Sequence, residues 1–169
     1  RLLNTMEPSA KGTLIYNTEL SQGIKAVAAK DDIIAIKIRS SRMMLASSFM
    51  HRVFEIFDNY SRPIDMIATS EVGVSVTIDN PLKLEHIVDE LKEIGTVSIN
   101  RDMVIICVVG DLEWHNSGFE AEALDALHDI PVRMISYGGS NYNISFLVSK
   151  EDKVAALRAL QKRLFKDNH

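Results

Sequence analysis

Several features that define whole classes of protein are scarce in this chain of 169 residues. Its single cysteine, Cys107, can neither close an internal disulfide nor hold a structural zinc ion by itself, so we expect a reducing, cytoplasmic location. The net charge of −4 leaves no basic excess, which argues against a nucleic-acid partner. No apolar run approaches the ~18 to 20 residues of a membrane-spanning helix, and no signal peptide is recognisable, so no membrane association is expected.

The composition predicts a folded chain, with 46% hydrophobic and 25% charged residues of both signs. This length suits one domain, or two small ones of roughly 70 to 80 residues each. Residues 1–22 are polar and irregular, with Pro8 and Gly12 as breakers, and predict a linker or extended arm. The chain starts at Arg1 without a methionine, which favours a piece of a longer protein.

Residues 33–100, the first repeat below, alternate between strand and helix periodicity. Strands are predicted at 33–38, 63–70, 72–79 and 96–100. Apolar residues recur at helical spacing from Phe49, where Ser47 or Ser48 would serve as N-cap, and again from Leu84 up to a capping Gly95. The order is therefore βαββαβ.

Residues 101–169, the second repeat, copy this pattern at an offset near 70. Ile34 falls on Val104, Phe49 on Phe119, and the segment from Pro63 on the segment from Pro131. The second repeat reads βαββα and lacks its last strand, while a spare strand at 24–29 precedes the first repeat. We therefore predict an α+β fold of two ferredoxin-like units, in which 23–32 plus 101–169 form one unit and 33–100 is inserted into it.

Ordinary signatures of catalysis are weak, so we expect no catalytic residue and no metal site. The five histidines share no ligand spacing with a cysteine or carboxylate. Cys107 lies mid-strand and is expected to be a buried, inert thiol. Gly138-Gly139-Ser140 is followed by a strand, which favours a tight turn over a phosphate-binding loop.

One difference between the repeats has chemical meaning. Asp65 of the first repeat corresponds to Arg133 of the second. A cationic ligand would be attracted by the first and repelled by the second. From the residues alone, a solvated charge at a strand start is the stronger interpretation of Asp65.

Five segments, in order and without gaps, match a known family. They are NTMEPSAKGTLI (4–15), GIKAVAAKDDIIAIKIRS (23–40), RMMLASSFMHRVFEIF (42–57), PIDMIATSEVGVSVTID (63–79) and VRMISYGGSNYNISFLV (132–148). These segments resemble the regulatory region of aspartate kinases, with IATSEV (67–72) and MISYG (134–138) as the most specific parts. The ending resembles the monofunctional, lysine-sensitive class, in which no homoserine dehydrogenase domain follows.

The resemblance implies a tandem pair of ACT domains and a homodimer. It also implies that the first ACT units bind lysine, which is the feedback inhibitor of the first step of aspartate-family amino-acid biosynthesis. The lysine-binding residues carried over from the family are Met43, Ser48, Phe49, Met50, Ile64, Asp65, Thr69, Ser70, Glu71 and Val72. Asp65 would meet the ligand ε-ammonium. Backbone N–H groups at Phe49 and Met50 would receive its α-carboxylate.

The family's kinase motifs, including a Lys-Phe-Gly-Gly segment, are absent from this chain. The fragment is thus expected to be non-catalytic and to need no cofactor. The resemblance implies a separate kinase domain that uses ATP and Mg²⁺ to phosphorylate the aspartate side-chain carboxylate.

Rival interpretations fit the same element order. An RNA-recognition module would need aromatic residues on its central strands, which 33–38 and 72–78 lack. An acylphosphatase-like enzyme would need an arginine-bearing phosphate loop, for which only Arg39 and Arg42 qualify. The closer alternative is an ACT-type module that senses another amino acid, such as threonine.

Overall fold

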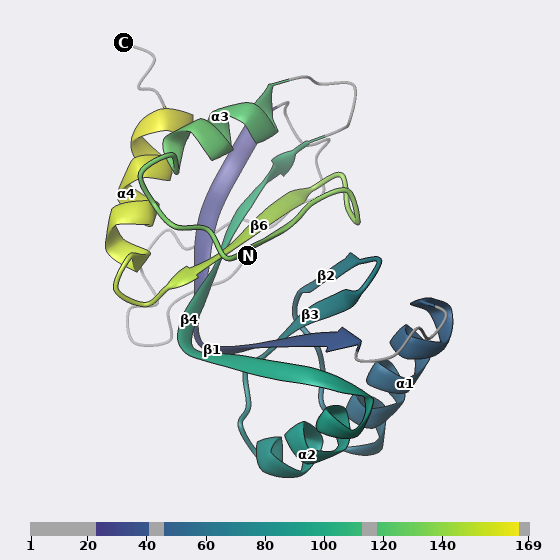
Figure 1. Ribbon diagram of the computed structural model, residues 1–169. Helices are drawn as coiled ribbons and strands as arrows, with labels where there is room; N and C mark the ends of the chain where they lie inside the picture. The colour runs from purple at the N-terminus through teal and green to yellow at the C-terminus, as the bar shows by residue number, and fades with distance from the viewer. Residues whose placement is uncertain (1–22, 41–45, 113–117, 166–169) are drawn as a thin grey trace, which may run out of the picture.

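The computed structural model describes residues 23–40, 46–112 and 118–165, so the predicted arm at 1–22 lies outside the described residues. The elements are β1 (Gly23–Ser40), α1 (Ala46–Asn59), β2 (Ile67–Ser70), β3 (Gly73–Ile78), α2 (Leu84–Ile94), β4 (Gly95–Asp111), α3 (Phe119–Ala126), β5 (Met134–Ser136), β6 (Asn143–Ser149) and α4 (Lys153–Leu164). Figure 1 shows two lobes, each with a pair of helices on its outer side. None of the described helices is long and apolar enough to cross a membrane.

The predicted α+β fold is confirmed, and so is the insertion of the first repeat into the second. All strands pair antiparallel in the order β2-β3-β1-β4-β6-β5. The early part of β1 pairs with the late part of β4, with Ala28 opposite Cys107, whereas the late part of β1 pairs with β3 and the start of β4. Segment 24–29 thus completes the sheet of the second repeat.

The sheet differs from the prediction in being continuous. The strands predicted separately at 24–29 and 33–38 are one strand, β1, and those at 96–100 and 103–110 are one strand, β4. Both strands bend where the lobes meet (Figure 1). Asp32 and Asp102 adopt positive φ there, at 59° and 55°, and the β1–β4 register shifts on either side of Ile33. Such bulges bend strands without ending them. Separate domains with the predicted boundaries stay a prediction.

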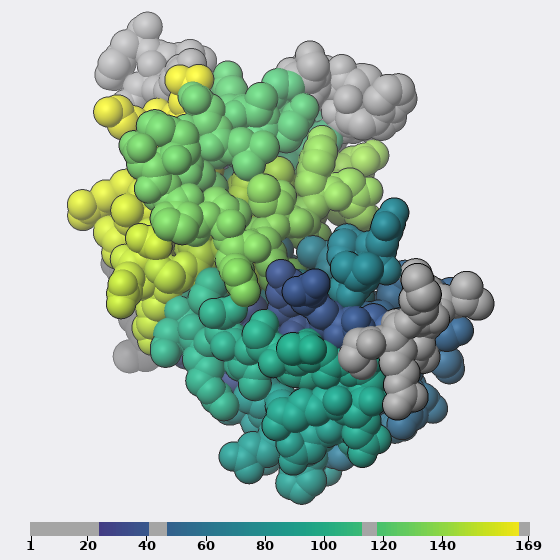
Figure 2. Space-filling model, in the orientation of Figure 1, coloured from purple at the N-terminus to yellow at the C-terminus, as the bar shows by residue number. Residues whose placement is uncertain are grey.

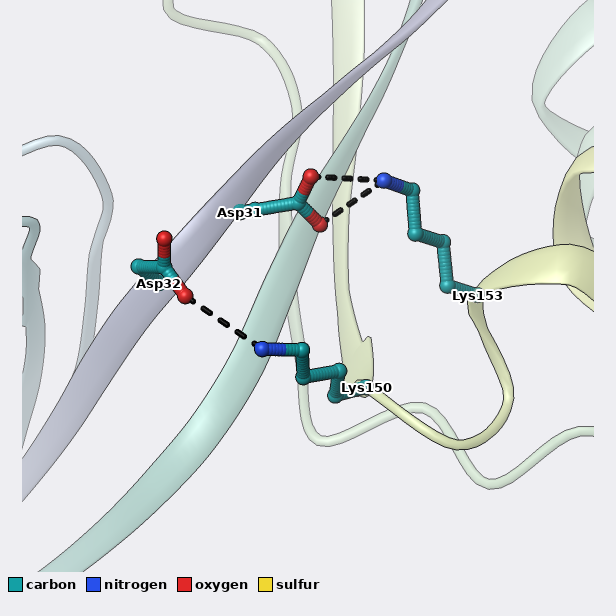
Figure 3. Close-up of polar contacts among 4 residues, drawn as sticks. All are labelled: Asp31, Asp32, Lys150 and Lys153. Atoms are coloured by element: carbon teal, nitrogen blue, oxygen red, sulfur yellow. Dashed lines mark hydrogen bonds and ion pairs between the residues drawn. The ribbon is translucent and has the colours of Figure 1, made fainter.

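Ion pairs lie at the bend (Figure 3). Lys153 Nζ contacts both carboxylate oxygens of Asp31, at 2.8 and 2.6 Å. Lys150 Nζ lies 3.4 Å from Asp32 Oδ1. These contacts connect β1 to the junction of β6 and α4, and each contributes modestly because its groups are partly exposed to solvent.

Each repeat has its own helix-covered core. The first is centred on buried residues of β1, β3, α1 and α2, and the second on residues of β4, β6, α3 and α4. A smaller cluster lies on the opposite, helix-free face and joins the two repeats. It consists of Ile33, Ala35, Met66, Met103, Ile105, Met134 and Leu147. Residues of β1 thus alternate between a helix-covered and a helix-free face, as a strand's two-residue period requires.

Two helix ends differ from expectation. Helix α1 begins at Ala46, so Ser47 and Ser48 lie within its first turn and the prediction of either as N-cap is wrong. Gly95 does follow α2, but in an extended conformation (φ −171°) rather than the left-handed one of a common glycine cap. Glycine is required there by close packing, because a Cβ would lie 2.4 Å from the Arg39 carbonyl oxygen.

Candidate functional site

Asp65 and Arg133 occupy equivalent places in the two repeats, as the offset predicted. The backbone N–H of Asp65 donates to the Thr77 carbonyl at 2.9 Å, and that of Arg133 donates to the Leu147 carbonyl at 2.7 Å. The side chains differ in their partners. Arg133 donates to Asn100 Oδ1 at 3.0 Å, whereas Asp65 accepts from Lys30 Nζ at 2.6 Å. The fold therefore places a negative group in the first repeat at the position where the second repeat has a positive one.

Lys30 is shared by two carboxylates. Its ammonium lies 2.6 Å from Asp65 Oδ1 and 2.9 Å from Asp79 Oδ2. The hydrogen bonds to Asp65 and Asp79 raise the pKa of Lys30 above its ordinary value of 10.5. The hydrogen bond from Lys30 lowers the pKa of Asp79 below 3.8. The Asp65 side chain is 24% exposed, so this place accepts an ammonium and remains reachable from solvent.

A cavity of about 260 Å³ lies beside this ion pair. Its floor is a row of small side chains in register across three strands, with Cys107 opposite both Ala28 and Ser145. Lys30 and Asp65 line it as well. Cys107 is half-buried here, which corrects the expectation of a buried thiol, because it lies on the helix-free face where no helix covers it.

Other predicted site residues line a second cavity, of about 370 Å³, which we call the β2–β3 hollow. Thr69, Ser70 and Val72 line it, together with Ala68, Gly73, Ser75 and two cations, Lys37 and Arg39. Val72 is 56% exposed in the turn after β2, and its carbonyl accepts from the Ser40 N–H at 2.9 Å. Glu71, in the same turn, is also exposed.

The remaining predicted residues belong to α1 or face it. Phe49 is buried in the first core, and Met50 and Ile64 pack against that core. Ile64 also lines a third cavity, of about 540 Å³, with residues of α1. Ser48 is exposed in the first turn of α1. Met43 lies outside the described residues.

The nine predicted residues that the structure describes do not all line one of these three cavities. Asp65 lines the cavity beside Lys30, the Thr69–Val72 segment lines the β2–β3 hollow, and Ile64 lines the cavity beside α1. Sequence reasoning missed Lys30 and Asp79 as the neighbours of Asp65. No local pattern signals them, since Lys30 is separated from Asp65 by 35 positions.

Among the described residues, no group of three or more His, Cys, Asp or Glu side chains has a geometry that could hold a metal ion. The charged groups of these cavities instead suit small charged organic ligands. Asp65 suits an ammonium, whereas Lys37 and Arg39 suit an oxyanion.

Comparison with known proteins agrees with this fold. The ACT domain family profile matches residues 106–164. A solved domain from Porphyromonas gingivalis, assigned to the C-terminal regulatory region of aspartate kinase, is 57% identical, with a TM-score of 0.78 over 83% of this chain and 97% of that one. E. coli aspartokinase III, solved in complex with lysine and aspartate, is 28% identical, with a TM-score of 0.76 over 89% of this chain and 35% of that one.

Among curated proteins, the chloroplastic aspartokinase 1 of Arabidopsis thaliana is 33% identical over 98% of this chain and 31% of its own length. The chain thus spans about a third of the curated relatives it matches. The match to the Porphyromonas gingivalis domain covers 97% of that domain. The part of its relatives that this chain spans is therefore their C-terminal regulatory region. The chain belongs to the family of C-terminal ACT regulatory regions of aspartate kinases.

Proposed function

We propose that this chain binds lysine and thereby conveys feedback inhibition to an attached aspartate kinase domain, which uses ATP and Mg²⁺. The observation that carries the proposal is the ammonium of Lys30 at 2.6 Å from Asp65. Asp65 thus has the exposure and geometry to receive a primary ammonium, the group at the end of a lysine side chain. The E. coli relative that was solved in complex with lysine supports the same choice of ligand.

The second repeat is not expected to bind lysine in the same way. Arg133 stands at the place of Asp65 and would repel the ligand's ammonium. We therefore propose one type of lysine site, in the first repeat.

The α-carboxylate of lysine would lie at the start of α1. Because α1 begins at Ala46, the backbone N–H groups left without an intrahelical acceptor are those of the first turn, around Ser47 and Ser48, rather than those of Phe49 and Met50. These N–H groups and the helix dipole favour a carboxylate.

A homodimer would complete the site. Asp65 and the first turn of α1 do not share any of the cavities formed by the described residues, which favours contributions from two copies. β2 is an edge strand of the sheet, with Ile67 43% exposed, so it can pair with a second copy.

Lysine would act by shifting a population of conformations. It would favour the arrangement whose kinase domains are inactive by its higher affinity for that arrangement. Changing a mostly active enzyme to a mostly inactive one needs about 3 to 5 kcal/mol of such difference, which two ligands per dimer can share.

The proposal is tested by titrating the chain with lysine in a calorimeter, comparing Asp65→Asn with the parent. The substitution keeps the size of the side chain and removes its charge. Loss of a partly desolvated ion pair should cost on the order of 2 to 4 kcal/mol, or roughly 30- to 1000-fold in affinity. Arg133→Asn, the matched change in the second repeat, should leave lysine affinity nearly unchanged.

Two outcomes would redirect the proposal. If Asp65→Asn binds lysine as tightly as the parent, Asp65 is not the cation site and Glu71 becomes the better candidate. If threonine binds the parent chain and lysine does not, the module senses threonine. Sedimentation with and without lysine tests the dimer, and a monomer under both conditions at high protein concentration would contradict it.

A further inference from the structure

We propose that the β2–β3 hollow is a second ligand site, which binds the phosphate group of a small phosphorylated molecule. The hollow lies on the helix-free face of the first repeat. Ile36 and Ile38 point into the helix-covered core, so Lys37 and Arg39, which alternate with them along β1, point to the other face. Figure 2 shows atoms of β1, in purple, at the surface between the two lobes.

The strand register assembles the hollow. Lys37 lies opposite Ser75 and Arg39 opposite Gly73 on β3. Gly73 in turn lies opposite Ser70 on β2. A Cβ at Gly73 would lie 3.6 Å from Arg39 Cγ and 3.7 Å from Ser70 Oγ, so the absence of a side chain keeps open the space between this cation and this hydroxyl.

The two cations have no counter-charge among the residues that the structure describes. Across residues 23–40, 46–112 and 118–165, no ion pair or side-chain hydrogen bond involves Lys37 or Arg39, and no carboxylate lines the hollow. Lys30 and Lys153, by contrast, each contact an aspartate. Two adjacent positive charges without a counter-charge attract an anion.

The second repeat shows that this charge is not a requirement of the fold. At the offset of 70, Lys37 corresponds to Cys107, Arg39 to Val109 and Ser75 to Ser145. The equivalent surface of the second repeat therefore keeps the serine of this pair of strands but has neither cation. The positive charge belongs to the first repeat alone.

The donors in the hollow favour phosphate. Arginine offers a planar fork of N–H groups, lysine a point charge, and the hydroxyls of Ser75 and Thr69 further donors. The Ser70 hydroxyl already donates to the Gly73 carbonyl oxygen at 3.4 Å. A phosphate monoester carries close to two negative charges at neutral pH and several acceptor oxygens. The volume of about 370 Å³ leaves room for a small organic substituent.

The proposal does not depend on lysine binding at Asp65. Because Thr69, Ser70 and Val72 of the hollow are also among the residues that the resemblance assigns to lysine, its test includes competition between phosphate and lysine. The chain is titrated with inorganic phosphate, and with succinate at equal ionic strength, while backbone amide chemical shifts are followed by NMR. Phosphate should saturate shifts at residues 37–39 and 68–75. The double variant Lys37→Gln/Arg39→Gln should bind phosphate at least tenfold more weakly without a change in melting temperature, because both side chains are exposed.

The matched control is Arg158→Gln/Lys162→Gln, which removes the same charge from exposed positions of α4 and should leave phosphate binding unchanged. Three outcomes would overturn the proposal. Equal weakening by the control would show a general charge effect, and tighter binding of succinate would show a dicarboxylate site. Competition between phosphate and lysine would show that the hollow holds the carboxylate end of the amino acid.

Discussion

Lys30 occupies with its own ammonium the position at Asp65 that we assign to the ammonium of a lysine ligand. Its Nζ lies 2.6 Å from Asp65 Oδ1, and the Lys30 side chain is 47% exposed. In a single chain, an exposed ion pair of this kind is worth about 0 to 1 kcal/mol, less than the partly desolvated pair that we propose for a ligand between two copies, so a ligand could displace it at small cost. Lys30 therefore competes intramolecularly with a lysine ligand for Asp65.

On the proposed function, Lys30→Gln should therefore tighten lysine binding. Removal of the competing ammonium frees both Asp65 and Asp79, and the affinity should rise by up to about 5-fold in a calorimetric titration. Lys150→Gln removes the same charge from a lysine that pairs with Asp32 instead, and should leave the affinity unchanged. Weaker binding by Lys30→Gln would show that Lys30 supports the site.

The contribution of Lys30 to stability should depend on pH at both ends of the scale. Its pKa is raised above 10.5, so its contribution is complete below that pH and is lost as the pH rises through the higher folded pKa. The pKa of Asp79 is lowered below 3.8, so its contribution is present above that pH and is lost as the pH falls through the lower folded pKa.

The urea midpoints of the parent and Lys30→Gln should thus differ by a constant amount at intermediate pH and converge at both extremes. The difference should correspond to no more than about 1 kcal/mol, because the groups are solvated. Lys162→Gln, on the exposed side of α4, provides the control for loss of one positive charge. If the difference in urea midpoint between the parent and Lys30→Gln is the same from strongly acidic to strongly alkaline pH, this account is wrong.

Gly95→Ala should destabilise the protein although Gly95 does not adopt a left-handed conformation. Its Cβ would lie 2.4 Å from the Arg39 carbonyl oxygen, so β1 and β4 would have to separate locally. Overpacking of this kind costs about 1 to 3 kcal/mol in the free energy of unfolding. Gly139→Ala, whose Cβ would meet nothing within 4 Å, should change stability by less than about 0.5 kcal/mol. Equal stability of the two variants in urea would contradict the packing argument.

Thr77→Val should also destabilise the first repeat. Thr77 is fully buried, and its Oγ1 accepts a 2.9 Å hydrogen bond from the Met66 N–H, just beyond Asp65. Valine would leave this buried N–H without its acceptor, at a cost of about 1 to 3 kcal/mol. Thr96→Val, at an exposed position of β4, is the control for the effect on stability of replacing threonine by valine in a strand. The prediction fails if both substitutions leave the urea midpoint where it was.

The order of elements was predictable from the sequence because it depends on local patterns. A two-residue period marks the strands around Ile36 and Val76, a longer period marks α1 and α2, and the offset near 70 repeats the order. The count of strands also predicted that segment 24–29 completes the second repeat. Asp65 was recognisable because it differs from Arg133 in an otherwise similar setting.

The tertiary structure decided what these patterns cannot express. An aspartate such as Asp32 or Asp102 is compatible with a turn as well as with a bulge. The strands form one bent sheet only because β1 pairs with β4 across both repeats. Likewise, Lys30 meets Asp65 and Asp79, and Lys37 and Arg39 share a hollow with Ser70, because pairing brings together residues that are distant in sequence. Periodicity reports which face of an element is buried, whereas the partner of each exposed charge depends on strand order and register.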